Sequence, residues 1–173
     1  MLIGILSDSH GDAVATRLAI ELLRERGATQ FFHCGDICGE AVLDELAACH
    51  ATRFVWGNCD HPSPTLRKYV RDIGLAPPEV PVLAEIDGKS IAVYHGHERP
   101  FFLACLKPAT DYIFHGHTHV FADNRAGRCR IINPGALYRA RVKTVALLNP
   151  SMDDLQFLRL EDGERVRMAS GKM

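Results

Sequence analysis

Five short apolar runs in this chain each lead into side chains that can bind a metal ion. Continuous apolar runs of this length are typical of strands that are buried on both faces. The runs are residues 2–6, 30–33, 52–56, 90–94 and 111–114, and the side chains that follow them are Asp8 and His10, Asp36, Asn58, His95, and His117 and His119. Open parallel sheets bind their ligands beyond the carboxyl ends of the strands. The sequence therefore predicts a sheet-based fold with one site built from several strand ends.

Helical patterns separate the first three runs. Asp12 can cap a helix whose apolar residues recur at helical spacing, and Gly27 suits the end of that helix. Residues 40–49 form a second amphipathic pattern, and residues 66–73 and 101–106 predict shorter helices. The resulting alternation of strands and helices predicts parallel pairing of the first three strands.

From residue 80 onward the pattern changes mainly to strands. Asp87-Gly88 separates two β-like runs and predicts an antiparallel hairpin. Further β-like runs cover residues 120–124, 129–132, 142–148 and 155–160, while the polar residues from 162 onward are expected to fray. The whole order predicts an α/β fold in which two mixed sheets pack together with helices outside.

The composition fits one globular domain over residues 1–173. Apolar residues make up 47% of the chain, which is enough for one sizeable core. The formal net charge is −1 without a block of like charge, so neither a nucleic-acid surface nor a membrane surface is indicated. The N-terminal apolar run is too short for a signal sequence, and the spacing of the six cysteines fits free thiols. We therefore expect a cytoplasmic protein.

Three histidines within five residues, His115, His117 and His119, favour a metal site over unrelated surface or core histidines. In an extended chain, residues two apart project to one side, so His117 and His119 are expected to face the site and His115 to be structural. The mixture of carboxylate, amide and imidazole donors suits Mn, Fe, Zn, Ni or Co. Seven donors exceed the needs of one four-coordinate ion. We therefore expect two ions that share a carboxylate, an arrangement that serves phosphate chemistry.

Five motifs contain these donors in a fixed order: D-x-H at 8–10, G-D at 35–36, G-N-C-D at 57–60, H-G-H at 95–97 and G-H-T-H at 116–119. This order resembles the calcineurin-like metallophosphoesterases, and most of all their small bacterial and archaeal phosphodiesterase branch. The eukaryotic retromer scaffold subunit is also similar to that branch. The resemblance covers nearly the whole chain. It implies a four-layer αββα sandwich and hydrolysis of phosphoesters by a metal-bridging hydroxide.

The resemblance also implies how two divalent ions share the seven ligands. One ion would be held by Asp8, His10, Asp36 and His119, and the other by Asp36, Asn58, His95 and His117, so that Asp36 bridges them. Manganese is the preferred metal, with nickel, iron, zinc or cobalt as alternatives. Two such ions and a hydroxide beside two carboxylates leave a charge of about +1, which suits a phosphodiester and also permits a monoester.

Cys59 departs from the family pattern. Many members have a histidine there, which assists the transition state or protonates the leaving group. A thiol with a pKa of about 8.5 replaces imidazolium poorly, so His97 or His61 could supply the proton instead. The candidate catalytic residues are Asp36, Asn58 and His97, and Asp60 is expected to orient its neighbours through hydrogen bonds.

The leading interpretation is a dinuclear metal-dependent phosphodiesterase that hydrolyses a small or nucleotide-like phosphoester. One alternative is a phosphomonoesterase or nucleotidase with the same site. Another is a non-catalytic protein-interaction scaffold of the retromer-subunit type. A scaffold has no chemical need to retain all seven ligands, and this chain retains them, which favours the enzyme. The sequence leaves the oligomeric state open, including a homodimer.

Overall fold

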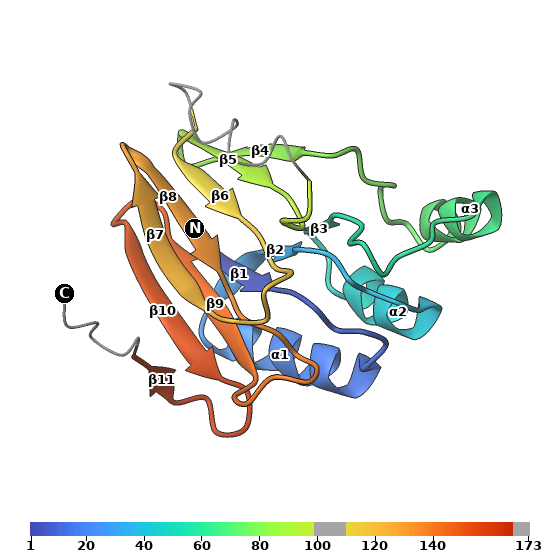
Figure 1. Ribbon diagram of the computed structural model, residues 1–173, viewed down its shortest axis with the longest axis horizontal. Coiled ribbons are helices and arrows are strands. Elements are labelled where there is room, and N and C mark those ends of the chain that lie inside the picture. The colour runs from blue at the N-terminus through green and yellow to red at the C-terminus, as the bar shows by residue number, and fades with distance from the viewer. Residues whose placement is uncertain (99–109, 168–173) are drawn as a thin grey trace.

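The computed structural model describes residues 1–98 and 110–167. Within these residues, a six-stranded sheet and a five-stranded sheet face each other, and helices cover the first sheet (Figure 1). The two facing mixed sheets and the helices outside them confirm the predicted α/β sandwich. The helix predicted at 101–106 lies outside the described residues.

The first sheet combines parallel and antiparallel strands. Its strands are β1 (Leu2–Leu6), β2 (Ala28–His33), β3 (Thr52–Phe54), β9 (Thr144–Asn149), β10 (Asp154–Arg159) and β11 (Arg165–Val166), in the order β11-β10-β9-β1-β2-β3. β1, β2 and β3 are parallel, while β9 pairs antiparallel with both β1 and β10. The carboxyl ends of β1, β2 and β3 therefore lie at the same edge of this sheet.

The second sheet is also mixed, with a parallel centre and antiparallel edges. Its strands are β4 (Val82–Ile86), β5 (Lys89–Val93), β6 (Tyr112–Phe114), β7 (Ala122–Ala126) and β8 (Cys129–Asn133), in the order β4-β5-β6-β8-β7. β5, β6 and β8 are parallel to one another. The predicted hairpin is confirmed, because β4 and β5 pair antiparallel around Asp87 and Gly88, which both have positive φ.

The described residues contain three helices, and side chains cap the first turns of two of them. The three helices are α1 (Ala13–Glu25), α2 (Glu40–Ala48) and α3 (Pro64–Asp72). The Asp12 side chain accepts a hydrogen bond from the backbone of Ala15 at 2.9 Å and caps α1, as predicted. Gly27, with a φ of 90°, follows the end of the same helix. Ser63 caps α3 through the backbone N–H of Leu66.

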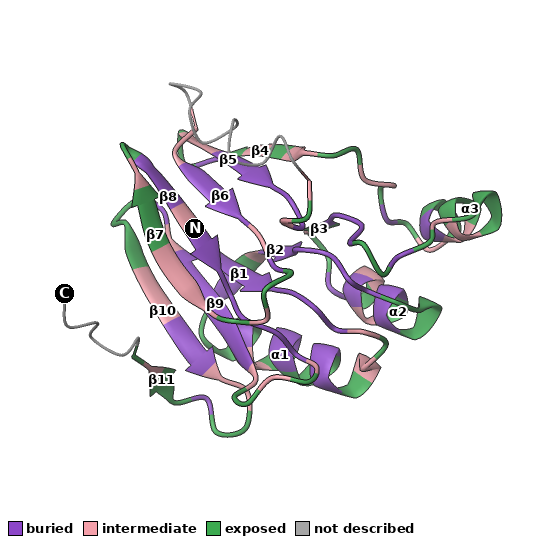
Figure 2. Ribbon diagram, viewed as in Figure 1, coloured by how far each residue is buried: buried purple, intermediate pink, exposed green. Residues whose placement is uncertain are grey.

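The strands of the first sheet separate two apolar layers. In β1, Leu6 packs with the helices, while Ile3 and Ile5 pack against the second sheet. Between the sheets, the rings of Phe32 from β2 and Phe114 from β6 meet edge to face, with centroids 5.5 Å apart. Figure 2 shows buried residues on the central strands and on the sheet-facing sides of the helices. Packing on both faces explains why these strands are continuously apolar.

Two expectations about the later strands need correction. β7 begins at Ala122, two residues after the predicted start at 120. Residues beyond 162 do not simply fray, because β11 pairs with β10 and Val166 packs against the apolar layer between the sheets. The described helices include none that is long and apolar enough to cross a membrane.

Candidate metal centre

The loops that follow parallel strands of both sheets meet at one place. The loops after β1, β2 and β3 supply Asp8 and His10, Asp36, and Asn58, and those after β5 and β6 supply His95, His117 and His119. Contacts join the two sheets here: Nε2 of His95 lies 2.9 Å from Oδ1 of Asn58, and Nε2 of His119 lies 3.4 Å from Oδ1 of Asp8. Residues far apart in the sequence thus form one cluster.

Asp8, His10, Asp36 and His119 form one part of this cluster. Each offers one ligand atom, and these four atoms all lie within 4.8 Å of one another. Nε2 of His10 is 3.2 Å from Nε2 of His119 and 3.4 Å from Oδ2 of Asp36. Two carboxylates and two imidazoles that converge in this way fit the donor set of a divalent transition metal. These four residues could therefore hold one metal ion.

Asp36 also borders the second part of the cluster. Its Oδ2 lies 3.4 Å from Nε2 of His95, the same distance that separates it from Nε2 of His10. Oδ1 of Asn58 faces the same His95 nitrogen, and the ring centroid of His117 lies 5.1 Å from that of His95. One carboxylate oxygen thus lies between imidazole groups contributed by loops of the two sheets.

The protonation of the buried groups depends on their mutual contacts. Burial raises the pKa of Asp8. Burial also opposes a charge on Asp36, but hydrogen bonds from His95 and from the Cys59 backbone hold the pKa of its carboxyl well below the usual value. Although burial opposes its charge, the pKa of His95 is raised by Asp36 and by the Cys34 carbonyl, which lies 2.8 Å from Nδ1. Asp36 is therefore a stably charged centre of the cluster.

Five of the seven predicted ligands have a left-handed backbone conformation. Their φ values are 56° at Asp8, 43° at His10, 56° at Asp36, 68° at His117 and 60° at His119. This conformation is uncommon for residues other than glycine and costs on the order of 1–3 kcal/mol per residue. Strain of this kind clusters at functional sites. The surrounding fold therefore holds these side chains in place against a local preference.

The prediction that an extended chain directs His117 and His119 to one side is wrong. β6 ends at Phe114, and neither histidine is extended, so alternation along a strand does not direct them. The left-handed backbone at these two residues sets the direction of their side chains instead. His115 is half-buried, and its Nδ1 lies 3.1 Å from the carbonyl of Gly116; partial burial lowers the pKa of His115 to about 4.

Two glycines permit the close approach of the ligand loops. A Cβ atom on Gly57 would lie 2.1 Å from Oδ1 of Asp36, and one on Gly116 would lie 1.9 Å from Oγ of Ser7 and 2.5 Å from Oδ2 of Asp8. Real Cβ atoms essentially never make such contacts. Backbone therefore packs directly against both carboxylates, which explains the glycine before Asn58 and the one before His117.

The sequence profile of the calcineurin-like phosphoesterase superfamily domain matches residues 1–152. This chain belongs to the calcineurin-like phosphoesterase superfamily. It is a metal-dependent phosphoric ester hydrolase by family. A phosphodiesterase of Methanocaldococcus jannaschii is 27% identical over 170 residues, which cover 93% of this chain and 100% of that relative.

Solved structures show the same fold. An archaeal phosphodiesterase has a TM-score of 0.82 at 26% identity, with 92% of this chain and 99% of that chain covered. Vps29 of Entamoeba histolytica, solved in complex with Zn²⁺, has a TM-score of 0.66 at 21% identity, with 96% of this chain and 98% of that chain covered. The calcineurin-like sandwich therefore includes both an enzyme and a vacuolar-sorting protein among its known structures.

Asp60 of the phosphoesterase G-N-C-D motif orients two ligand loops. Its Oδ2 accepts hydrogen bonds from the backbone of Gly57 at 2.7 Å and of Ile37 at 3.2 Å, while Oδ1 accepts one from Cys38 at 2.7 Å. These contacts confirm the predicted orienting role of Asp60. They join the loop that holds Asp36 to the loop after β3.

Two supporting residues were not predicted. Glu98 accepts hydrogen bonds from the backbone of His95 at 3.2 Å and of Gly96 at 2.7 Å. Asn133, the last residue of β8, donates to the carbonyl of Gly116 at 2.8 Å and thereby supports the G-H-T-H turn. Asn133 also follows an apolar run, so the strand-end pattern that revealed the other site residues could have revealed this one.

His97 and Cys59 both lie beside the cluster. The ring centroid of His97 lies 5.3 Å from that of His95 and 6.2 Å from that of His117, and its Nδ1 is 3.7 Å from Oε2 of Glu98. The Cys59 thiol is exposed, and desolvation together with the adjacent Asp36 raises its pKa. His97 therefore places an imidazole beside two of the predicted ligands.

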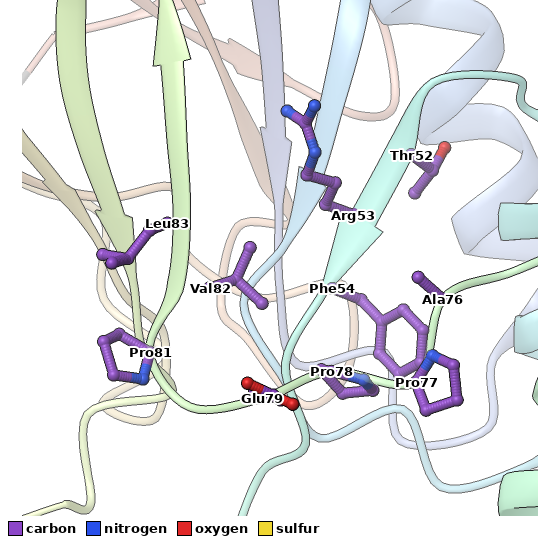
Figure 3. A pocket seen from close by; sticks show the side chains of 10 residues that line it. All are labelled: Thr52, Arg53, Phe54, Ala76, Pro77, Pro78, Glu79, Pro81, Val82 and Leu83. Carbon is purple, nitrogen blue, oxygen red and sulfur yellow. The ribbon is translucent and has the colours of Figure 1, made fainter.

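A separate cavity of about 340 Å³ lies between the edge strands β3 and β4. Figure 3 shows Pro77 and Pro78 beside Phe54, with Val82 and Leu83 on the other side. No histidine or cysteine lines this cavity. The prolines cover an edge of the first sheet, a common protection against unwanted strand pairing. The candidate chemistry therefore belongs to the metal centre.

Proposed function

We propose that this chain is a dinuclear metal-dependent phosphodiesterase that hydrolyses a small or nucleotide-like phosphoester. The observation that supports this most strongly is the position of Asp36. Its Oδ2 lies 3.4 Å from Nε2 of both His10 and His95. A charged carboxylate oxygen between two sets of imidazoles is suited to bridging two ions. The similarity to a protein named as a phosphodiesterase points to the same reaction.

The proposed ligand sets follow the two parts of the cluster. The first ion is held by Asp8, His10, Asp36 and His119, and the second by Asp36, Asn58, His95 and His117. The carbonyl of Cys34 fixes Nδ1 of His95 as the protonated nitrogen, which leaves Nε2 free to bind. Manganese is the proposed metal, and nickel, iron, zinc or cobalt fit the same donors.

When bound, two metal ions would acidify a water and polarise the phosphoryl oxygens. Asp36 holds negative charge at the centre, while Asn58 adds a neutral oxygen that limits the charge opposing an anionic ester. His97 donates the proton that the leaving group needs, because its ring lies beside the second ligand set and is partly exposed. Glu98 holds the backbone on which His97 lies.

Metal content and turnover test the proposed function together. The purified protein should contain two ions per chain after incubation with Mn²⁺ and should hydrolyse bis-p-nitrophenyl phosphate. Asp36→Ala should lose both ions, and His95→Ala should lose one and abolish turnover. The matched control is His50→Ala, since His50 is exposed and lies in none of the motifs. Fewer than two ions with no turnover under any metal would refute the proposal, and a scaffold function would then be favoured.

The identity of the acid and the ester class need separate measurements. We expect His97→Ala to remove the basic limb of the pH–rate profile and His61→Ala to leave it unchanged. Rates on p-nitrophenyl phosphate, a monoester, should be lower than those on the diester. The reverse preference would assign the site to a phosphomonoesterase or nucleotidase.

A further inference from the structure

The connection between β8 and β9 runs alongside the metal-ligand loop of β1. The backbone N–H of Leu137 donates to the carbonyl of Ser7 at 3.2 Å, directly before the predicted ligand Asp8. Thr144 donates to the carbonyl of Pro134 at 2.7 Å, and the Leu137 side chain is fully buried. This part of the connection is therefore held firmly next to the candidate centre.

Two residues emerge from this anchored segment beside the first ligand set. The ring centroid of Tyr138 lies 5.5 Å from that of His10. The guanidinium carbon of Arg139 lies over the Tyr138 ring, 5.1 Å from its centroid. Tyr138 is half-buried and Arg139 is exposed. A row of side-chain contacts thus begins at the predicted metal ligand His10 and ends at the exposed Arg139.

Two features of Arg139 bear on ligand binding. Its φ is 48°, a left-handed conformation that is uncommon outside glycine. Among residues 1–98 and 110–167, no carboxylate forms an ion pair with it. A strained, unpaired guanidinium on an aromatic ring beside a phosphoesterase centre is suited to contact with the substrate.

We propose that Tyr138 and Arg139 form a stacking surface that binds the nucleobase of a nucleotide ester, which makes nucleoside phosphodiesters the substrate class. This inference rests on the proposed phosphodiesterase function. The metal ligands meet only the phosphate, which all esters share, so selectivity must come from groups beside them. Aromatic rings and arginine planes both stack on bases without requiring a particular base.

Two esters with the same leaving group test the surface. Thymidine 5′-(p-nitrophenyl phosphate) and methyl p-nitrophenyl phosphate both release p-nitrophenolate when water attacks phosphorus, and they differ only in the group that remains. We expect Arg139→Ala and Tyr138→Leu to lower kcat/KM for the thymidine ester by about tenfold more than for the methyl ester. Equal losses on both esters would show that Arg139 contacts the phosphate and would overturn the proposal.

Binding measurements keep the inference separate from turnover. Metal-loaded protein should bind thymidine 5′-monophosphate about tenfold more tightly than methyl phosphate, and Arg139→Ala should remove that difference. Arg139→Lys keeps the charge without the planar guanidinium, so it should behave like Arg139→Ala. Tyr138→Phe keeps the ring and should retain the preference for the thymidine compound. Arg141→Ala, which removes a neighbouring exposed arginine, is the surface control. Equal affinity of the unmutated protein for both phosphates would refute the stacking surface even if the diester is hydrolysed. Selective binding of thymidine 5′-monophosphate without hydrolysis of the diester would support the stacking surface and refute only the proposed function.

Discussion

The backbone N–H of Cys59 donates a hydrogen bond of 2.8 Å to Oδ1 of Asp36. This bond occupies one carboxylate oxygen and leaves Oδ2 facing His10 and His95, each at 3.4 Å. The backbone of residue 59 therefore contributes directly to the geometry of the centre. This backbone contact does not require histidine at position 59, so the site can keep its geometry with cysteine there.

Replacement of the Cys59 side chain should have little effect on a good leaving group. The pKa of the thiol is raised, so a neutral and weakly acidic group is removed by Cys59→Ala. We expect kcat on bis-p-nitrophenyl phosphate to stay within about threefold. In a His97→Ala background, which lacks the proposed acid, Cys59→His introduces an imidazole that can donate a proton, so esters of poorly leaving alcohols should gain about tenfold or more. No gain on those esters would show that leaving-group protonation does not limit their hydrolysis.

Gly116→Ala should disrupt the first ligand set. The added Cβ would lie 1.9 Å from Oγ of Ser7 and 2.5 Å from Oδ2 of Asp8, so one of the two loops must move. We expect a loss of about 1–3 kcal/mol in the free energy of unfolding and a lower metal content. The matched control is Gly39→Ser, because a Cβ on Gly39 meets nothing within 4 Å and serine suits its position before α2. Urea unfolding and metal analysis of both variants measure the effect, and equal metal content would contradict it.

The strand-end pattern was enough to predict which loops meet. Apolar runs that are buried on both faces are visible in the sequence. Residues after parallel strands of one sheet lie at the same edge, so Asp8, Asp36 and Asn58 could be placed together without a structure. The hairpin at 87–88 was equally predictable, because its turn chemistry is local. The first inference needs only a general rule about parallel sheets, and the second needs only residues that are neighbours in the chain.

Other features depend on contacts that the sequence does not reveal. The left-handed φ of His117 results from packing of its turn against Asp8, whose carboxylate accepts from the His117 backbone at 3.1 Å. β11 was not predicted from the sequence. It has only two residues, and polar residues surround them, so they form a strand only because they pair with β10. The support that Asn133 gives to Gly116 depends on β8 lying beside β6 in the sheet. Long-range pairing, rather than local pattern, determines all three.

Asp60→Asn should weaken metal binding without removing a ligand. The carboxylate accepts three backbone hydrogen bonds, from Gly57, Ile37 and Cys38, and an amide would place a donor against at least one of them. We expect metal affinity to fall by about 10- to 100-fold and the free energy of unfolding by about 1–3 kcal/mol. Isothermal titration with Mn²⁺ and urea unfolding of the metal-free protein check this. Asp154→Asn is the control at an exposed carboxylate, and identical Mn²⁺ affinity in both variants would refute the orienting role.

His33 connects the first two ligand loops from a buried position. Its Nδ1 accepts a hydrogen bond from the backbone of Gly35 at 3.2 Å, so Nε2 carries the proton and donates to Oγ of Ser9 at 2.8 Å. Protonation of Nδ1 would place its N–H against the backbone N–H of Gly35, so that two donors would face each other. Burial therefore lowers the pKa of His33 from 6.5 to about 3. The ring is neutral in the folded protein throughout the physiological range.

This depressed pKa predicts how stability depends on pH. Below 6.5 the unfolded chain takes up a proton at His33 while the folded protein does not until about pH 3, so stability falls as the pH decreases through this window. We expect the metal-free protein to lose about 2 kcal/mol at this group between pH 7 and pH 5. His33→Gln cannot take up that proton, so its free energy of unfolding should decrease less over the same range. Urea unfolding of both proteins in EDTA at pH 7, 6 and 5 measures the difference. Parallel pH profiles would mean that His33 is protonated in the folded state and that its bond from Gly35 does not determine its charge.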